Sequence, residues 1–176
     1  NRIVFCVPYT LIDYFYKNQN KNFIEIGAQN CHHIGSSGPY TGGVNATMIK
    51  NAGSKYVILG HSENRSNGET NLLIKKKVES ALKQNLNIIF CIGETQKEKK
   101  SRKTFKILRN QIKSVLNKKI NPRKIIIAYE PVWSIGTGLI PKEATLKETF
   151  SFIKSRFRKK YPKILYGGSV NSDNIN

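Results

Sequence analysis

Short apolar segments alternate with longer helical stretches along the whole chain, and this alternation restricts the fold more than any other feature of the sequence. The apolar segments are rich in Val and Ile and are short, as strands are. They are mostly apolar on both faces, which is typical of parallel strands covered on both sides. We therefore predict six strands, at Arg2–Val7, Ile24–Asn30, Lys55–Leu59, Asn87–Ile92, Lys124–Tyr129 and Lys163–Tyr166.

The segments between these strands have the pattern of helices. Between Leu72 and Leu82, for example, apolar residues recur at the spacing of an amphipathic helix. Repeated strand–helix units form a parallel sheet, either open and doubly wound or closed as a barrel, and periodicity does not distinguish the two. No change in composition marks a linker, so we expect one α/β domain over residues 1–176. The predicted helices are Leu11–Lys17, Ala46–Ala52, Thr70–Gln84, Gln96–Asn117 and Glu143–Arg158.

The chain is strongly basic. Its 176 residues include 30 Lys and Arg against 11 Asp and Glu, a formal net charge of +19. Such a charge is typical of proteins that bind nucleic acid or an anionic surface. Here the basic residues are spread over separate segments, and no basic strand carries the aromatic residues that stack on bases. We therefore expect no nucleic-acid partner, and a positive field that attracts a phosphorylated substrate.

The cysteines and the apolar runs indicate where in the cell the protein is expected. Cys6, Cys31 and Cys91 are odd in number and widely spaced, which favours reduced thiols in a cytoplasmic protein. Cys31-His32-His33 cannot converge on one ion and no second Cys/His pair follows, so we predict no metal site. The apolar runs are far shorter than the ~20 residues that a membrane helix needs, and the chain does not open with a signal peptide. We expect no membrane partner.

A polar or glycine-rich turn follows five of the predicted strands. The carboxyl ends of the strands of a β/α fold gather on one face. This places His61 and three glutamates, Glu63, Glu94 and Glu130, at the same end of the sheet. The turns are Ala28-Gln29-Asn30, Gly60-His61-Ser62-Glu63, Cys91-Ile92-Gly93-Glu94, Ala128-Tyr129-Glu130-Pro131-Val132-Trp133 and Tyr166-Gly167-Gly168-Ser169.

Two of these segments predict chemistry from their residues. Glu130 ends a strand beside Pro131 and Trp133, where apolar neighbours raise the pKa of a carboxyl group and make it a stronger base. Gly136-Thr137-Gly138 superficially matches a dinucleotide-binding motif, but Pro141 takes the place of the third glycine. We interpret this segment as a mobile lid whose backbone N–H groups face a phosphate and which excludes water.

The five turns, in this order, resemble the triosephosphate isomerase family. The resemblance is most specific over Ala128-Tyr129-Glu130-Pro131-Val132-Trp133-Ser134-Ile135-Gly136-Thr137-Gly138, and it extends over essentially the whole chain. It implies a (β/α)8 TIM barrel, a homodimer and no cofactor. It also implies a glycolytic and gluconeogenic isomerase that interconverts dihydroxyacetone phosphate and D-glyceraldehyde 3-phosphate. That reaction proceeds by acid–base proton transfer through an enediolate.

The resemblance also implies residue roles. In this family a glutamate is the base and a neutral histidine, its pKa lowered by a helix N-terminus, polarises the carbonyl group. These roles fall to Glu130 and His61, with Glu63 as a third catalytic residue. Gly136, Gly168 and Ser169 are implied to bind the phosphate, Ser169 also helps Tyr166 to latch the closed lid, and Glu94 serves the open lid beside Trp133. The implied lid and hinge residues are Pro131, Val132, Trp133, Ser134, Ile135, Thr137, Gly138 and Tyr166; those of the dimer loop are Tyr40, Thr41 and Gly42.

The sequence departs from the family pattern at two internal positions and at both ends. Gly43 and Asn64 stand where the family commonly has a glutamate and an arginine that pair with each other. No Asn-x-Lys motif of the first strand precedes Arg2, and no Gly-Gly of the last strand follows Asn176. A complete barrel needs about 250 residues. We therefore expect an incomplete barrel of about six β-α units, truncated at both ends. The expected origin of the truncation is a gene fragment, an incomplete gene model or a decayed copy of a gene. We expect this chain to be inactive alone.

Two alternatives remain open at this point. The first is a non-catalytic basic remnant that binds nucleic acid or another polyanion. The second is another phosphate-binding barrel, such as an enzyme of the indole-glycerol-phosphate type. That class explains Tyr166-Gly167-Gly168-Ser169 but not His61-Ser62-Glu63 together with the Trp133 lid.

Overall fold

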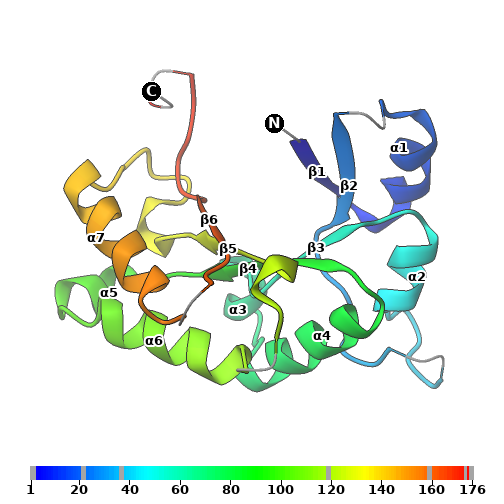
Figure 1. Cartoon of the computed structure of the whole chain (residues 1–176), viewed down its shortest axis with the longest axis horizontal. Helices are drawn as coiled ribbons and strands as arrows, with labels where there is room; N and C mark the ends of the chain where they lie inside the picture. Colours follow the sequence, from blue (N-terminus) through cyan, green and yellow to red (C-terminus); the bar gives the residue numbers. More distant parts are fainter. Residues whose placement is uncertain are drawn as a thin grey trace.

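Six parallel strands form one sheet in which the spatial order follows the chain order (Figure 1). The computed structural model describes residues 3–20, 23–35, 38–117, 120–157, 160–172 and 174. All six predicted strands are confirmed, with ends that differ by at most two residues; Arg2 lies outside the described residues. The strands are β1 (Ile3–Val7), β2 (Ile24–Ala28), β3 (Tyr56–Leu59), β4 (Asn87–Ile92), β5 (Ile125–Tyr129) and β6 (Lys163–Tyr166).

The strand order decides between the two folds that periodicity left open. Each strand pairs in parallel with the next one along the chain, from β1–β2 to β5–β6. A doubly wound sheet reverses its strand order at a switch point, whereas a barrel adds every unit on the same side. The uninterrupted order is therefore that of an incomplete (β/α) barrel, as predicted.

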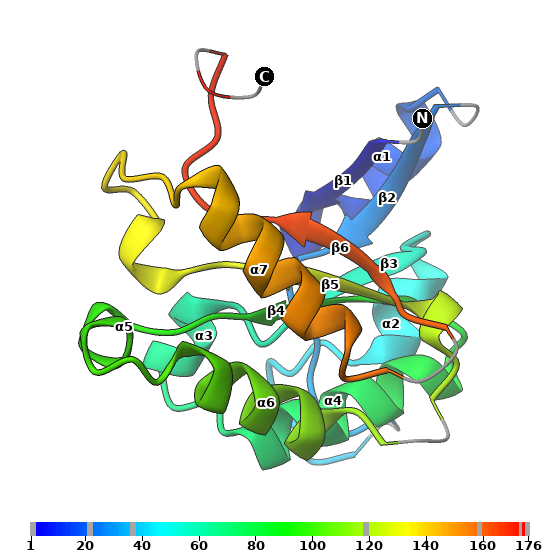
Figure 2. The same ribbon diagram turned by 60° about the vertical axis from the view of Figure 1, so that its left-hand side comes forward.

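Helices cover the outer side of the sheet. Helices α4 and α6 lie side by side beneath it, and α7 covers the side where β5 and β6 lie (Figures 1 and 2). Capping explains where several helices begin: Asn45 accepts from the N–H of Met48, and Thr70 accepts from the N–H of Leu73. The helices are α1 (Ile12–Asn18), α2 (Ala46–Asn51), α3 (Ser62–Ser66), α4 (Asn71–Lys83), α5 (Gln96–Lys100), α6 (Thr104–Val115) and α7 (Glu143–Lys154), with 3-10 turns η1 (Tyr9–Leu11), η2 (Pro122–Lys124) and η3 (Val132–Ser134).

The prediction of one helix over Gln96–Asn117 was wrong, because two helices occupy this segment. A capping box between Thr95 and Glu98 starts α5, and α5 ends before Ser101. Arg102 then adopts φ = 55°, a left-handed conformation that an α-helix of L-residues cannot continue through. The predicted helix Glu143–Arg158 also ends earlier, at Lys154, and Arg158 lies outside the described residues.

Burial separates the central strands from the edge strands. Ile88 and Phe90 of β4 and Ile127 of β5 are fully buried, and these two strands are covered on both faces as expected. The edge strands β1 and β6 differ, since Ile3 is 63% exposed and Leu165 is 47% exposed. An exposed apolar edge is a site at which a further strand can pair.

Candidate active site

The carboxyl ends of β3 to β6 bring the polar turns to one end of the sheet. His61 follows β3 after one residue, and Glu94 follows β4 after one residue. Glu130 follows β5 directly, and Gly167 follows β6. The arrangement comes from the parallel topology, which points all these strand ends in the same direction.

His61 and Glu130 face each other. Nε2 of His61 lies 3.7 Å from Oε2 of Glu130. On the other side of the ring, Nδ1 of His61 accepts a hydrogen bond from the backbone N–H of Glu63 at the start of α3, at 3.4 Å. A nitrogen that accepts carries no proton, so the neutral ring carries its proton on Nε2. The N–H of His61 is therefore on the side of Glu130.

The carboxylate of Glu130 is buried and only partly hydrogen-bonded. Burial raises its pKa, and a hydrogen bond from Cys91, the His61 ring, the backbone of Ser62 and the Arg65 charge oppose this rise. Oε1 accepts from Sγ of Cys91 at 3.1 Å. Oε2 has no hydrogen-bond partner of regular geometry among the residues that the structure describes. A buried carboxylate oxygen without a donor is free to accept a proton from a bound molecule.

Two glycines leave the space that Glu130 occupies. A Cβ at Gly93 would lie 1.8 Å from the backbone oxygen of Glu130. A Cβ at Gly167 would lie 2.7 Å from Cγ of the same residue. Any other residue at either position would displace the backbone or the side chain of Glu130. The sequence showed these glycines only as parts of turns, and their contacts became visible in the structure.

Sequence reasoning also missed the residues that hold the strand ends together. Arg65 donates from Nε to the carbonyl of Gly60 at 2.7 Å and from Nη2 to that of Cys91 at 3.3 Å, so it joins the ends of β3 and β4. The amide of Gln111 both donates to and accepts from the backbone of Gly93, each at 3.0 Å. The position of Arg65 in the turn after His61 was the only signal for it in the sequence.

The base of the predicted lid is packed against Glu94. Nε1 of Trp133 donates to Glu94 at 2.9 Å, and the hydroxyl of Tyr129 donates to the same carboxylate at 3.1 Å. Burial, together with Glu94, raises the pKa of Tyr129, so its hydroxyl keeps the proton that it donates. Nζ of Lys99 lies over the Trp133 ring, 3.1 Å from its centre. The predicted neighbourhood of Glu94 and Trp133 is thus present.

Ser134 connects the lid to the turn after β6. Its hydroxyl lies 2.8 Å from the hydroxyl of Tyr166, and it donates to the carbonyl of Leu139 at 2.5 Å. Ser169 donates to the backbone carbonyl of Ser134, also at 2.5 Å. Tyr166 and Ser169, both predicted to act on the lid, therefore do contact it. Ser134 was predicted only as a member of the lid, and its central position in this network was not.

The remaining predicted residues differ in burial. Gly136, Thr137 and Gly138 form an exposed tip, in contrast to the buried Trp133 and Ser134 at the base of the lid. Pro131 is buried, Val132 and Ile135 are half-buried beside the hinge, and Gly168 lies between Gly167 and Ser169. The side chain of Glu63 is 82% exposed, with its carboxylate 3.7 Å from Nδ1 of His61.

The dimer-loop residues Tyr40, Thr41 and Gly42 are exposed, and the Tyr40 ring packs on His32 with 5.3 Å between ring centres. Asn64, which replaces an arginine of the family pattern, accepts a hydrogen bond from Asn30 at 3.2 Å. Asn30 also donates to Glu69 at 3.2 Å and accepts from Lys77 at 2.9 Å. Asn64 thus belongs to a polar cluster within this chain.

A cavity of about 450 Å³ opens beside His61, a size suited to a small metabolite. Its lining comes from the ends of β1, β2 and β3 and from α3: Pro8, Tyr9, Gln29, Asn30, Ile58, His61, Glu63 and Asn64. Within the described ranges, no three His, Cys, Asp or Glu side chains are grouped closely enough to hold a metal ion. The same ranges contain no helix of the length and apolarity that crossing a membrane requires.

Comparison with known proteins agrees with this geometry. A model of the family described as triosephosphate isomerase matches residues 1–176. The chain is 42% identical to the triosephosphate isomerase of Thermodesulfovibrio yellowstonii over 159 residues, which are 86% of this chain and 64% of that protein. It is 38% identical to the triosephosphate isomerase of Bartonella henselae over 176 residues, which are 96% of this chain and 69% of that protein.

The fold also matches a solved structure of the same family. The crystal structure of triosephosphate isomerase from Bartonella henselae superimposes with a TM-score of 0.89 at 37% identity, over 98% of this chain and 73% of that one. The chain thus spans between 64% and 73% of the length of these relatives. Because the family model matches every residue from 1 to 176, this chain belongs to the triosephosphate isomerase family.

Proposed function

We propose that the protein interconverts dihydroxyacetone phosphate and D-glyceraldehyde 3-phosphate. One observation carries this proposal: Nε2 of His61 lies 3.7 Å from a buried oxygen of Glu130 that no regular hydrogen bond from the described residues occupies. A carboxylate with a raised pKa and a histidine N–H at the same strand ends are the two groups that a proton transfer next to a carbonyl requires. The family to which the chain belongs supports the choice of substrate.

In the proposed reaction, Glu130 removes a proton from the carbon next to the substrate carbonyl. The N–H of His61 donates a hydrogen bond to the carbonyl oxygen, where negative charge develops as the enediolate forms. The Nε2 proton of His61 then passes to the carbonyl oxygen, and His61 takes the proton of the neighbouring hydroxyl oxygen, which becomes the new carbonyl oxygen. Glu130 returns its proton to the former carbonyl carbon, which completes the exchange of ketone and aldehyde. Burial makes Glu130 a stronger base than an exposed carboxylate would be.

We assign the lid to the phosphate end of the substrate. The exposed tip at Gly136 and the turn at Gly168 and Ser169 offer backbone N–H groups that suit a phosphate. Closure of the tip would exclude water from the enediolate. The hydrogen bonds from Trp133 to Glu94 and from Ser169 to the carbonyl of Ser134 support a lid base that stays fixed while the tip moves.

We further propose that the 176-residue chain alone has negligible activity. The exposed apolar edges at Ile3 and Leu165 support this, because an open sheet edge leaves core side chains in water. The test is a chimera, called here the completed chain, in which residues 1–176 are joined at both ends to the terminal segments of the Bartonella henselae relative that the match does not cover.

We expect the completed chain to isomerise glyceraldehyde 3-phosphate and the 176-residue chain to show only background turnover. Glu130→Gln and His61→Gln should each abolish most of the activity of the completed chain. Lys76→Gln, on the exposed side of α4, is the matched control and should leave the activity unchanged. An active completed chain whose Glu130→Gln variant keeps full turnover would refute the assignment of the base.

We propose a cytoplasmic homodimer in which the loop at Tyr40, Thr41 and Gly42 contacts the second subunit. The exposure of this loop and the free state of Cys6, Cys31 and Cys91 support this. Light scattering of the completed chain and of its Thr41→Arg variant tests the dimer. The alternative of a non-catalytic polyanion-binding protein stays a prediction, and a steep salt dependence of RNA binding by the 176-residue chain would support it.

A further inference from the structure

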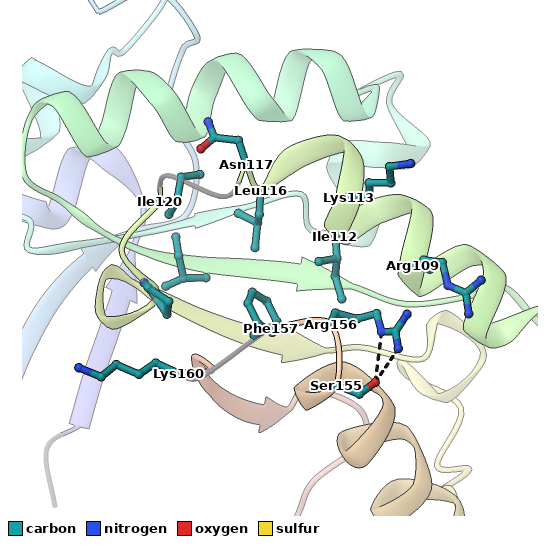
Figure 3. Close-up of a pocket in the computed structure, with 12 residues that line it drawn as sticks. Arg109, Ile112, Lys113, Leu116, Asn117, Ile120, Ser155, Arg156, Phe157 and Lys160 are labelled. Atoms are coloured by element: carbon teal, nitrogen blue, oxygen red, sulfur yellow. Dashed lines mark hydrogen bonds between the residues drawn. The ribbon is translucent and has the colours of Figure 1, made fainter.

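Figure 3 shows a second cavity, of about 700 Å³. Its residues Pro122 and Ile125 lie at the amino-terminal end of β5, so the cavity is at the opposite end of the sheet from His61, which follows the carboxyl end of β3. The cavity is formed by the second half of α6, the segment that leads into β5, and the residues that follow α7. Its volume is in the range of small-molecule binding sites. It shares no residue with the proposed active site. The described lining residues are Arg109, Ile112, Lys113, Leu116, Asn117, Ile120, Pro122, Ile125, Ser155, Arg156, Phe157 and Lys160.

The floor of this cavity is apolar. Ile112 and Leu116 point from the α6 side toward Phe157 (Figure 3). Ile112 and Ile125 belong to the buried core, and Leu116, Ile120 and Phe157 pack partly exposed against it. The cavity therefore opens directly onto core side chains, and a ligand with an apolar body would remove this surface from water.

The rim of the cavity is cationic. Arg109, Lys113, Arg156 and Lys160 are exposed, and the lining contains no Asp or Glu. Within the described residues, none of the four has a carboxylate at ion-pair distance. The guanidinium groups of Arg109 and Arg156 approach the same ring, that of Phe152, at 5.8 Å and 4.7 Å from its centre.

Two arginines at one edge of an apolar cavity are complementary to a particular kind of molecule. Arg156 donates from Nε and Nη2 to Oγ of its neighbour Ser155, which holds the guanidinium in place and leaves its other N–H groups available (Figure 3). A planar guanidinium binds carboxylate, sulfonate or phosphate oxygens with charge-assisted hydrogen bonds. A nucleic-acid backbone would match these charges but would leave the apolar floor uncovered.

We propose that this cavity binds a small amphipathic anion, a molecule with an aromatic or aliphatic body and one acidic group. The body lies on Ile112, Leu116 and Phe157, and the acidic group faces Arg109 and Arg156. This site is independent of the proposed isomerase reaction, and its test needs no catalytic activity.

The test compares two fluorescent probes that share one apolar body. The first, 8-anilinonaphthalene-1-sulfonate, carries the anionic group, and the second, N-phenyl-1-naphthylamine, lacks it. Both are titrated into the purified protein, into the double variant R109Q/R156Q and into the charge-matched control K76Q/K142Q. Lys76 and Lys142 are exposed on α4 and before α7, outside the cavity lining. Far-UV circular dichroism checks that every variant is folded.

We expect saturable binding of one sulfonate probe per chain, with equal affinity for the unmodified protein and for K76Q/K142Q. R109Q/R156Q should bind the sulfonate probe roughly tenfold more weakly or worse, and the neutral probe as well as before. A third variant, Leu116→Gln, should weaken both probes. Equal affinity for the sulfonate probe in R109Q/R156Q and in the unmodified protein would overturn the proposal. So would an equal loss in K76Q/K142Q, since only the general charge would then matter.

Discussion

Nε2 of His61 lies 3.7 Å from Oε2 of Glu130, and each of these residues follows a different strand of the sheet. The separation is longer than a hydrogen bond, so the N–H of His61 does not donate to the carboxylate of Glu130. Both groups remain available to a molecule bound between the strand ends.

The ionisation of Glu130 should set the acidic limb of the pH–rate profile of the completed chain. Burial raises its pKa above the ordinary 4.5, and the carboxyl group acts as a base only after losing its proton. The value of kcat/KM should therefore fall as the pH decreases through this raised pKa. Steady-state kinetics over a pH series measures it. An acidic limb at the pH of an ordinary exposed carboxylate would contradict the prediction.

The same pKa shift has a consequence for stability. The pKa of Glu130 is higher in the folded state than in the unfolded chain. At pH values between these two pKa values the folded state binds more protons, so the free energy of unfolding decreases as the pH rises. Glu130→Gln should remove this part of the pH dependence. Its free energy of unfolding should exceed that of the unmodified protein most clearly above the raised pKa. Denaturant titrations at several pH values measure the difference.

Replacing Cys91 by Ala should destabilise the fold and raise the pKa of Glu130 further. Sγ of Cys91 donates to Oε1 of Glu130 at 3.1 Å, and this bond lowers the pKa of the carboxyl group. Its loss should move the acidic limb of the pH–rate profile to higher pH and decrease the free energy of unfolding by about 1 to 2 kcal/mol. Cys91→Ser keeps a donor at this place and should retain a limb near the original pH. Identical pH profiles for all three proteins would argue against a role of this bond.

Gly167→Ala should decrease activity without unfolding the protein. The added Cβ would lie 2.7 Å from Cγ of Glu130, so the carboxylate must move. A displacement of about 1 Å in a catalytic group costs about 100-fold in rate. We expect a loss of this order in the kcat of the completed chain, with its melting temperature changed by only a few degrees. Turnover within about threefold of the unmodified enzyme would show that Glu130 adapts to the extra atom.

Ser134→Ala should loosen the lid. The variant loses the contact with the Tyr166 hydroxyl at 2.8 Å and the bond to the carbonyl of Leu139. Each such bond contributes about 1 kcal/mol, and its loss would raise the ratio of loosened to packed lid base several-fold. Trp133 is the only tryptophan of the chain and is 9% exposed, so acrylamide quenching of its fluorescence reports directly on the lid base.

The quenching constant should rise in Ser134→Ala and stay unchanged in the control Ser114→Ala. Ser114 also makes a side-chain hydrogen bond, to Asn110 of α6, but it lies away from the lid. Equal quenching in both variants would show that Ser134 does not restrain the lid base.

Much of the fold follows from local patterns. The six strands are apolar segments bounded by turn residues, and their existence depends on short-range sequence alone. The prediction of one helix over Gln96–Asn117 was wrong because the local sequence carried no signal for the break. Residues 96–103 contain no apolar residue, so no periodicity showed where α5 ends, and the break depends on the φ angle of Arg102.

The sequence by itself determined that His61 and Glu130 share one end of a parallel sheet, because strand–helix repetition points every strand in the same direction. Only the tertiary structure decided how the two side chains meet. The proton position on His61, the thiol of Cys91 against Glu130, and the space left by Gly93 and Gly167 depend on strands that are distant in the chain. The same holds for the cationic cavity at Arg109 and Arg156, since contacts between separate elements are set by packing, which no local pattern records.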